Sequence, residues 1–224
     1  MMTKAALARV LNPVPPTKPS SIKRLRELER TVPAKADLIL FGDSLAAGWP
    51  SELLTDAAPG RRIFNFGLPG DRAQNTLWRI DNSPVAHLRP RTLILLVGTN
   101  NLGDGDPPDA VAVAIARTLE RARTIWGGPH AILVTIPQRG EPPGFREPER
   151  RRVNEALRHD LAQAGSVEIV DADLALALPD QRTATLSPDL LHISHEGYRR
   201  LSLSLAACLK LHDQRAASGA PNSR

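Results

Sequence analysis

Five short segments of the chain are almost continuously apolar, and each is followed by a stretch with a different pattern. Runs of this kind are typical of strands that are covered on both faces of a parallel sheet. The sequence therefore predicts five strands, at Asp37–Phe41, Arg62–Phe66, Thr92–Val97, Ala131–Ile136 and Val167–Val170.

Helices are predicted between these strands and after the last one. In one of them the apolar residues at positions 111, 115, 119 and 122 recur at a helical period. Strands that alternate with helices over short connections favour a three-layer α/β/α sandwich with a five-stranded parallel sheet. The strand order 2-1-3-4-5 is expected, with a ligand crevice at the carboxyl ends of the first and third strands. The predicted helices are Ala46–Leu54, Ala73–Ile80, Pro108–Ile125, Glu147–Ala164 and His195–Leu211.

The two ends of the chain differ in composition from this alternating region. Prolines within residues 11–21 indicate an extended linker, and a short charged helix is expected from Ile22 to about Glu29. The sequence predicts an N-terminal extension over residues 1–35, one domain over residues 36–212 and a disordered tail over residues 213–224.

Small polar residues follow the first and third predicted strands, where the fold would place its crevice. The first strand leads into Gly42-Asp43-Ser44, and the third into Gly98-Thr99-Asn100. A serine that starts a helix is most often an N-cap. The free N–H groups there also favour developing negative charge, which suits a nucleophile. Position alone leaves both roles open for Ser44.

A second chemical element, Asp189-Leu-Leu-His192, precedes the last predicted helix. A serine hydroxyl needs an imidazole to take its proton, and the imidazole needs a partner that fixes its tautomer. An Asp three residues before a His can reach the ring Nδ1 from a turn. We expect this pair to lie in a segment, residues 171–194, with little regular structure.

The third element is the turn Gly67-Leu-Pro-Gly70-Asp71 after the second predicted strand. Its simplest role is a strand-to-helix connection. Gly70 also lets the backbone approach a ligand closely. With the Ser44 N–H and the Asn100 amide, the Gly70 N–H would complete an oxyanion hole of three donors.

Together the four segments resemble the SGNH (GDSL-type) hydrolases, which are named for a Ser, a Gly, an Asn and a His in four blocks. The order and spacing of the blocks agree with that family from about residue 36 to residue 210. The subgroup of platelet-activating-factor acetylhydrolase-like esterases is the most similar. Its likeness rests on Asn65-Phe-Gly, Leu77-Trp-Arg79, Gly98-Thr-Asn-Asn101, Pro137-Gln-Arg-Gly140 and Glu196-Gly-Tyr198.

The resemblance implies a serine esterase that acts through an acyl-serine on Ser44, with His192 as base and Asp189 as its partner. Asp43 would support the site from behind the nucleophile. Leu45, Thr99 and Leu191 would wall a pocket for a small acyl group, acetyl above all. The substrate would be a small ester, either a lipid or an acylated sugar, and neither a metal nor an organic cofactor is implied. A carbohydrate O-acetylesterase, and a thioesterase or lysophospholipase, remain alternatives.

Three features depart from the pattern of the subgroup. Pro69 stands where the subgroup usually has glycine, and Leu190 replaces a glycine found in many members. The segment before Asp189 is also shorter. These differences concern the shape of the pocket more than the catalytic set.

Composition narrows the partners. The net charge is +5, but the arginines are scattered, and the run Arg150-Arg151-Arg152 lies among glutamates on a predicted helix. We expect a salt-bridged face there and no nucleic-acid partner. No apolar run approaches the ~20 residues that cross a bilayer, and no signal peptide is recognised. A cytoplasmic location is therefore expected, and a homodimer stays open.

Two other kinds of chemistry are disfavoured. Cys208 is the only cysteine, so it forms no intrachain disulfide, and we interpret it as a buried structural thiol. His192 and His195 lack a third ligand nearby in sequence, so no metal site is predicted. Ser44 lacks the second glycine of a Gly-x-Ser-x-Gly elbow. The alternative from another functional class is a non-catalytic binding or scaffold protein that keeps the fold.

Overall fold

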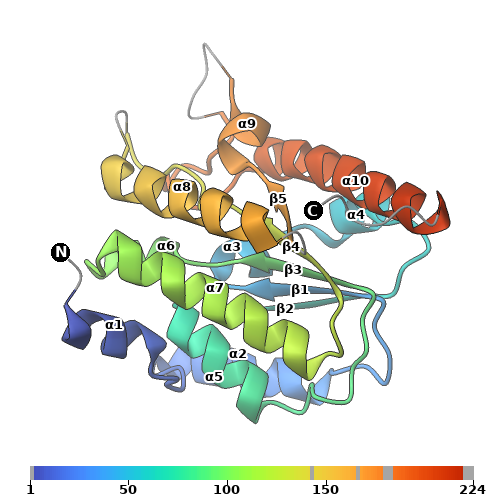
Figure 1. Cartoon of the computed structure of the whole chain (residues 1–224), viewed down its shortest axis with the longest axis horizontal. Helices are drawn as coiled ribbons and strands as arrows, with labels where there is room; N and C mark the ends of the chain where they lie inside the picture. Colours follow the sequence, from blue (N-terminus) through green and yellow to red (C-terminus); the bar gives the residue numbers. More distant parts are fainter. Residues whose placement is uncertain (1–2, 142–143, 165–166, 179–183, 219–224) are drawn as a thin grey trace.

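Five parallel strands form the centre of the molecule in the order β2-β1-β3-β4-β5, and helices cover both faces of the sheet (Figure 1). The computed structural model describes residues 3–141, 144–164, 167–178 and 184–218. Both the predicted strand order and the three-layer fold are confirmed. The strands are β1 (Leu38–Gly42), β2 (Ile63–Gly67), β3 (Thr92–Leu96), β4 (His130–Val134) and β5 (Val167–Val170).

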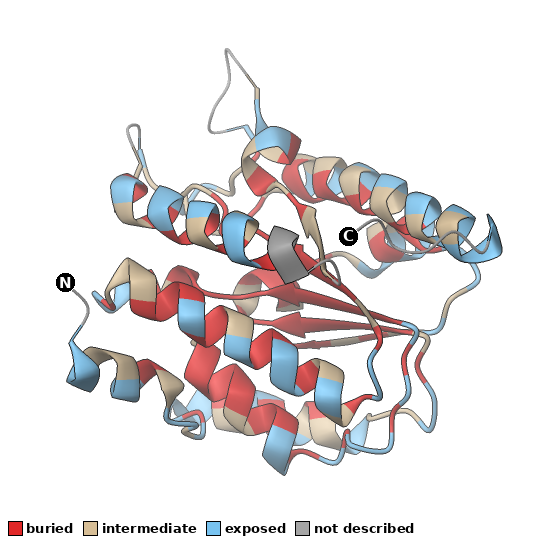
Figure 2. Ribbon diagram, viewed as in Figure 1, coloured by how far each residue is buried: buried red, intermediate tan, exposed pale blue. Residues whose placement is uncertain are grey.

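The sheet is apolar on both faces because each face packs against its own helices. Successive side chains of a strand point to opposite faces, so Ile39 and Phe41 join one buried cluster, while Leu38 and Leu40 join the other. Figure 2 shows the central strands as continuously buried, and every residue of β1 and β3 is buried. This double cover explains why the strands lack the apolar–polar alternation of a half-exposed sheet.

Most of the predicted helices are present, with shifted ends. Two of them, α7 (Pro108–Ile125) and α8 (Glu147–Ala164), have the predicted bounds, and α5 (Ala73–Asn82) is slightly longer than predicted. The single helix predicted over Ala46–Leu54 is wrong, because α3 (Ser44–Ala47) and α4 (Ser51–Ala57) are separate. Pro50 is the N-cap of α4, and a proline disfavours helical backbone in the residue before it.

Three short or terminal helices were not predicted. They are α1 (Lys4–Leu11), α6 (Thr99–Gly103) and α9 (Ala172–Leu176). The last lies in the segment 171–194 that was expected to be irregular, and an antiparallel bridge between Leu186 and Ile193 adds further order there. Asp171 explains part of the difference, since its carboxylate accepts the first N–H groups of α9.

The N-terminal extension packs on the domain. The helix α2 (Pro19–Arg30) begins before and ends after the segment predicted to be helical. Val10 of α1 and Leu25 and Leu28 of α2 are buried in the same cluster as Phe41. Residues 3–35 of the extension therefore help to complete one face of the core.

The final helix is longer than predicted. It is α10 (His195–Ser218), so residues 213–218 are helical and the prediction of disorder is wrong for them. Residues 219–224 lie outside the described residues. This one long helix packs on β5, α4 and α9.

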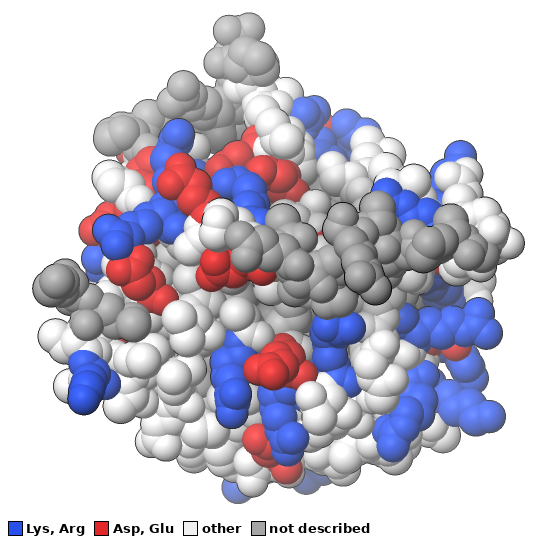
Figure 3. All heavy atoms as spheres, in the orientation of Figure 1, with Lys and Arg blue, Asp and Glu red and all other residues white. Residues whose placement is uncertain are grey.

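On the upper left of the face seen in Figure 3, Lys and Arg side chains lie beside Asp and Glu side chains, whereas Lys and Arg predominate at the lower right. Arg152 of α8 pairs with Asp109 of α7 at 2.7 Å, and Arg151 pairs with Glu147. Arg150 differs from the expected solvated face, because its guanidinium is buried and donates to the Ile136 carbonyl at the end of β4. The arginine run therefore serves structure within α8 and its neighbours.

Candidate active site

Ser44 is the first residue of α3 and directly follows the sharp turn that leads out of β1. Gly42 permits this turn, because its φ is +147° and a Cβ there would lie 1.9 Å from the Leu96 carbonyl oxygen. Asp43 is the N-cap of α3, and its Oδ1 accepts the Leu45 N–H at 2.8 Å. Because Asp43 fills the capping role, Ser44 itself is released from it.

The Asp43 carboxyl is fully buried beneath this turn. Burial raises its pKa to about 7, and the nearby Asp71 carboxylate adds to the rise, while the N–H groups of Leu45 and Gly98 and the charge of Arg139 oppose it. Asp43 thus supports the turn that carries Ser44 from below, as the resemblance implied.

Two side chains from distant parts of the chain hold α3 in place. Asn65 of β2 donates from Nδ2 to the Ala46 carbonyl and accepts the Gly67 N–H. Tyr198 of α10 donates its hydroxyl proton to the Leu45 carbonyl at 2.8 Å and is buried. The turn around Ser44 is therefore fixed from the second strand and from the last helix together.

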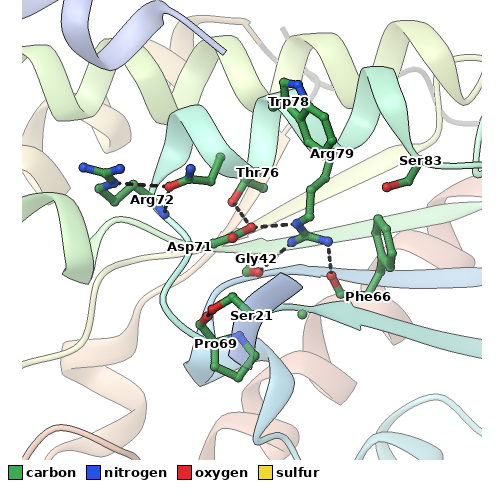
Figure 4. A network of polar contacts seen from close by, with 12 residues as sticks. Ser21, Gly42, Phe66, Pro69, Asp71, Arg72, Thr76, Trp78, Arg79 and Ser83 are labelled. Atoms are coloured by element: carbon green, nitrogen blue, oxygen red, sulfur yellow. Dashed lines mark hydrogen bonds and ion pairs between the residues drawn. The ribbon is translucent and has the colours of Figure 1, made fainter. Parts of the chain in front are cut away.

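A buried ion pair joins the ends of β1 and β2 to the Gly70 turn (Figure 4). Arg79 of α5 donates from Nε to Asp71 at 2.7 Å, from Nη1 to the Phe66 carbonyl and from Nη2 to the Gly42 carbonyl. Its guanidinium also stacks over the rings of Phe66 and Phe41. One side chain thus sets the separation between the strand end before Ser44 and the turn that carries Gly70.

Gly70 and Asn100 are brought together by the same turn. Gly70 has a φ of +84°, which favours glycine. The Asn100 Nδ2 donates to the Asp71 carbonyl at 2.8 Å, and that bond uses one of its two hydrogens. The neighbouring Asn101 is buried and holds the Ala73 N–H and the Asp106 carboxylate. Asn101 is therefore structural, and Asn100 is the member of the pair that has a hydrogen to offer.

Asp189 and His192 form the local pair that their spacing predicted. Asp189 Oδ2 lies 2.6 Å from His192 Nδ1, and Asp189 Oδ1 accepts the N–H groups of Leu191 and His192. The side-chain bond to His192, followed by these backbone bonds, lowers the pKa of Asp189 to about 2. The carboxylate therefore fixes Nδ1 and leaves Nε2 free to face another group.

The nearby histidine has a different environment. His195 Nε2 lies 3.7 Å from Glu52 of α4, so it points to a partner of its own and shares no carboxylate with His192. Among the described residues, neither Ser44 Oγ nor His192 Nε2 has a hydrogen-bond partner. The pair Asp189–His192 is assembled in this structure, whereas a Ser44–His192 hydrogen bond is not.

The three residues predicted to wall the acyl pocket differ in burial. Leu45, which follows Ser44, and Thr99, which precedes Asn100, are both buried. Leu191 is half-buried in the Asp189–His192 turn. Leu190 has a φ of +52°, which explains why the family places glycine there. Its carbonyl accepts the Gly140 N–H at 2.7 Å, so the turn at residues 137–140 braces the same loop.

A polar cavity of about 240 Å³ opens beside the oxyanion-hole candidates. Gly70 and Asn100 line one side of it, and Lys18 and Ser21 from the N-terminal extension line another. Ser21 donates to the Pro69 carbonyl at 2.9 Å, so Pro69 is held against α2. No sequence pattern predicts this wall, because residues 16–21 meet Gly70 only in the folded chain.

Arg79, Asp71 and Tyr198 carry roles that sequence reasoning did not assign. Arg79 and Tyr198 lie within segments that support the family resemblance, which was the available signal. Their roles depend on burial and on contacts that span much of the chain. No helix among the described residues has the length and apolar character needed to span a membrane.

Comparisons with known proteins agree with this geometry. Residues 40–200 match the model of the GDSL-like lipase/acylhydrolase family. The chain belongs to this family, and it is a carboxylic ester hydrolase of the SGNH type.

Several known proteins are similar to this chain over most of its length. The alpha1 subunit of human platelet-activating factor acetylhydrolase IB is 29% identical over 196 residues, which is 83% of this chain and 80% of the relative. A GDSL-family lipolytic protein from Veillonella parvula superposes with a TM-score of 0.66 at 22% identity, over 77% of this chain and 97% of its own. Est24, a carbohydrate acetylesterase from Sinorhizobium meliloti, gives 0.63 at 20% identity, over 78% and 98%. These two structures share the fold.

Proposed function

We propose that this protein hydrolyses esters of small acyl groups, acetyl above all, through an acyl-serine intermediate on Ser44. The observation that carries the proposal is the Asp189–His192 pair, which fixes Nδ1 and leaves Nε2 available as a base. The supporting observation is the Ser44 turn, in which Asp43 takes the capping role.

In the proposed reaction, His192 Nε2 removes the proton of Ser44 Oγ as the oxygen attacks the ester carbonyl. The oxyanion that forms is stabilised by the N–H groups of Ser44 and Gly70 and by the Asn100 amide. His192 then returns the proton to the departing alcohol. A water molecule, activated by the same histidine, releases the acid and restores Ser44.

Ser44 and His192 are not hydrogen-bonded in this structure. Catalytic hydrogen bonds are often long without substrate and tighten in the substrate complex. The His192 side chain is 42% exposed, so its ring is accessible to substrate and water.

The preference for a short acyl group rests on the buried neighbours Leu45 and Thr99. The carbonyl carbon binds about 3 Å from the serine oxygen, so the residues next to Ser44 and Asn100 must border the acyl chain. Extra methylenes in a packed site cost about 1–3 kcal/mol. A thioesterase or lysophospholipase would need a longer channel.

A carbohydrate O-acetylesterase is the second candidate, and the polar cavity favours it. Its lining of Lys18, Arg72, Asn75 and Asp104 beside Gly70 and Asn100 suits the hydroxyl groups of a sugar. The choice between lipid and sugar alcohols is decided by comparing kcat/KM for acetylated sugars with kcat/KM for acetylated glycerolipids.

The test of the mechanism uses a fluorophosphonate probe and p-nitrophenyl esters on the wild type and on Ser44→Ala. The wild type should be labelled once, at Ser44, and should cleave the acetate faster than the butyrate or octanoate. Ser44→Ala should lose labelling and about 10⁶-fold in kcat while its circular dichroism is unchanged. A folded, active Ser44→Ala protein would exclude the mechanism. A rate that rises with chain length would exclude only the acetyl preference.

A further inference from the structure

Three side chains of metal-binding type meet at the amino-terminal edge of the sheet, opposite the edge that carries Ser44. His130 is the first residue of β4, Glu168 lies near the start of β5, and His212 lies in α10. One ligand atom of each lies within 4.8 Å of the other two. These residues are far apart in the sequence and form no metal-binding motif. The sequence analysis therefore predicted no metal site.

His130 is the least satisfied member of this cluster. Its side chain is only 9% exposed, and both ring nitrogens are buried without a hydrogen-bond partner. Nε2 lies 3.6 Å from Glu168 Oε1, which is too long for a hydrogen bond. Buried polar atoms are nearly always paired. One ion occupies only one nitrogen of an imidazole ring, so we assign a ligand to the bare Nε2, which faces Glu168.

The separations suit ligands that share one ion. Two atoms bound to a tetrahedral zinc ion at 2.0–2.1 Å lie roughly 3.3 Å apart, close to the distance between His130 Nε2 and Glu168 Oε1. The rings of His130 and His212 are stacked, with centroids 3.5 Å apart and planes within 8°. Because the ring planes are nearly parallel, their lone pairs do not converge as they stand, and binding one ion requires the half-buried His212 side chain to turn.

The surroundings of Glu168 both support and oppose a cation. Cys208 donates its thiol to Glu168 Oε2, and ligating carboxylates are commonly held by such hydrogen bonds. Arg215 lies 3.4 Å from Oε1 and is 42% exposed, so it can move to solvent when an ion binds. An ion pair with Arg215 accounts for Glu168 alone and leaves the His130 nitrogens unpaired.

We propose that His130, Glu168 and His212 form a zinc-binding site that ties α10 to the edge strands β4 and β5. Two imidazoles and one carboxylate are a ligand set that zinc accepts, and imidazole disfavours the harder Mg²⁺ and Ca²⁺. The site lies at the sheet edge away from Ser44, so its role is to hold the last helix. It does not depend on the proposed esterase mechanism.

The test is calorimetric titration of Zn²⁺ into the full-length, tag-free protein after treatment with a chelator. One ion should bind per chain, with a micromolar or lower Kd. Zinc at about a hundred times its Kd should raise the Tm by about 5–10 °C. Co²⁺ in place of Zn²⁺ should give the intense visible bands of a tetrahedral site.

The deciding variants are His212→Ala and Glu168→Gln, because both side chains are partly exposed and neither change empties the core. Each should weaken Zn²⁺ binding at least tenfold and remove the tetrahedral Co²⁺ spectrum. His159→Ala is the matched control, since His159 is exposed on α8, and it should bind Zn²⁺ like the wild type. All three proteins should keep the wild-type rate on p-nitrophenyl acetate. Absence of binding at 100-fold molar excess of Zn²⁺, or equal binding by His212→Ala and the wild type, would overturn the proposal.

Discussion

The two halves of the candidate site are built in opposite ways. The Gly70 turn is anchored by Asp71 and Arg79, whose side chains are 1% and 0% exposed. The His192 turn is anchored by Asp189. The Asp189 side chain is 51% exposed and the His192 side chain is 42% exposed. Donors to an oxyanion act only if they are fixed before the reaction, whereas a base that collects and returns a proton must reach substrate and water. The core therefore holds the donors, and a local turn holds the base.

This comparison predicts that the exposed half can lose activity without losing stability. Asp189→Asn keeps an oxygen for the Leu191 and His192 N–H groups but presents an amide to Nδ1, which favours the wrong tautomer. We expect kcat to fall by about 10⁴, with a much smaller loss in the free energy of unfolding than a change in the buried half causes. Steady-state kinetics and urea unfolding measure the two quantities.

The control for this variant is Glu52→Gln, which alters the partner of His195 only. It should leave kcat near the wild-type value. If Glu52→Gln lowered kcat as much as Asp189→Asn does, His195 would be the base and the assignment of His192 would be wrong.

The buried half should behave in the reverse order, with a large loss of stability. Arg79→Met removes one partner of a buried ion pair and leaves the Asp71 carboxylate without its cation. Loss of one partner typically costs about 3–5 kcal/mol, and we expect the free energy of unfolding, measured by urea titration, to fall by that amount. Arg121→Met, which breaks the partly exposed pair with Asp81, should cost less than about 1 kcal/mol.

A second change sharpens the reading of Arg79. Asp71→Asn combined with Arg79→Met removes both charges and should recover part of the lost stability. If the double variant were no more stable than Arg79→Met, packing of Arg79 on Phe41 and Phe66 would matter more than its charge.

Asp43 predicts a pH dependence with a definite sign. Its pKa is raised from 3.8 to about 7 in the folded protein, so the native state binds the extra proton between these values. Stability therefore falls as pH rises from about 4 to about 7. Asp43→Asn lacks this titration and should gain about 2–4 kcal/mol relative to the wild type between pH 4 and pH 8.

Unfolding by urea at several pH values measures this effect, and the difference between the two proteins cancels the other titrating groups. Asn also caps helices, so the Leu45 N–H keeps its acceptor. Parallel stability profiles for the two proteins from pH 4 to pH 8 would show that Asp43 titrates normally.

The smallest effect is expected in the exposed turn. Leu190 adopts a φ of +52°, which costs a non-glycine residue about 1–2 kcal/mol. Glycine removes this strain, but it loses more backbone entropy on folding, which offsets part of the stabilisation. Leu190→Gly should therefore raise the Tm by about 1–3 °C. Leu190→Ala keeps the Cβ and should give no rise, so an equal rise in both variants would point to the leucine side chain instead of the backbone.

Sequence alone was sufficient for the features that depend on neighbouring residues. Continuous apolar runs require cover on both faces, so the five strands and their order followed from pattern. The Asp189–His192 contact followed as well, because three residues of a turn set the distance between the two side chains. The single helix predicted over Ala46–Leu54 is wrong, although the signal against it was local, because Pro50 separates α3 from α4.

Tertiary structure decided the features that depend on residues far apart in the chain. The Gly70 turn is positioned by Arg79 through carbonyls at two strand ends, and Tyr198 holds the Ser44 turn across 153 positions of sequence. The cluster of His130, Glu168 and His212 likewise exists only because β4, β5 and α10 pack side by side. Sequence patterns report local conformation and burial, whereas the direction of a buried hydrogen bond is set by which elements the whole core brings into contact.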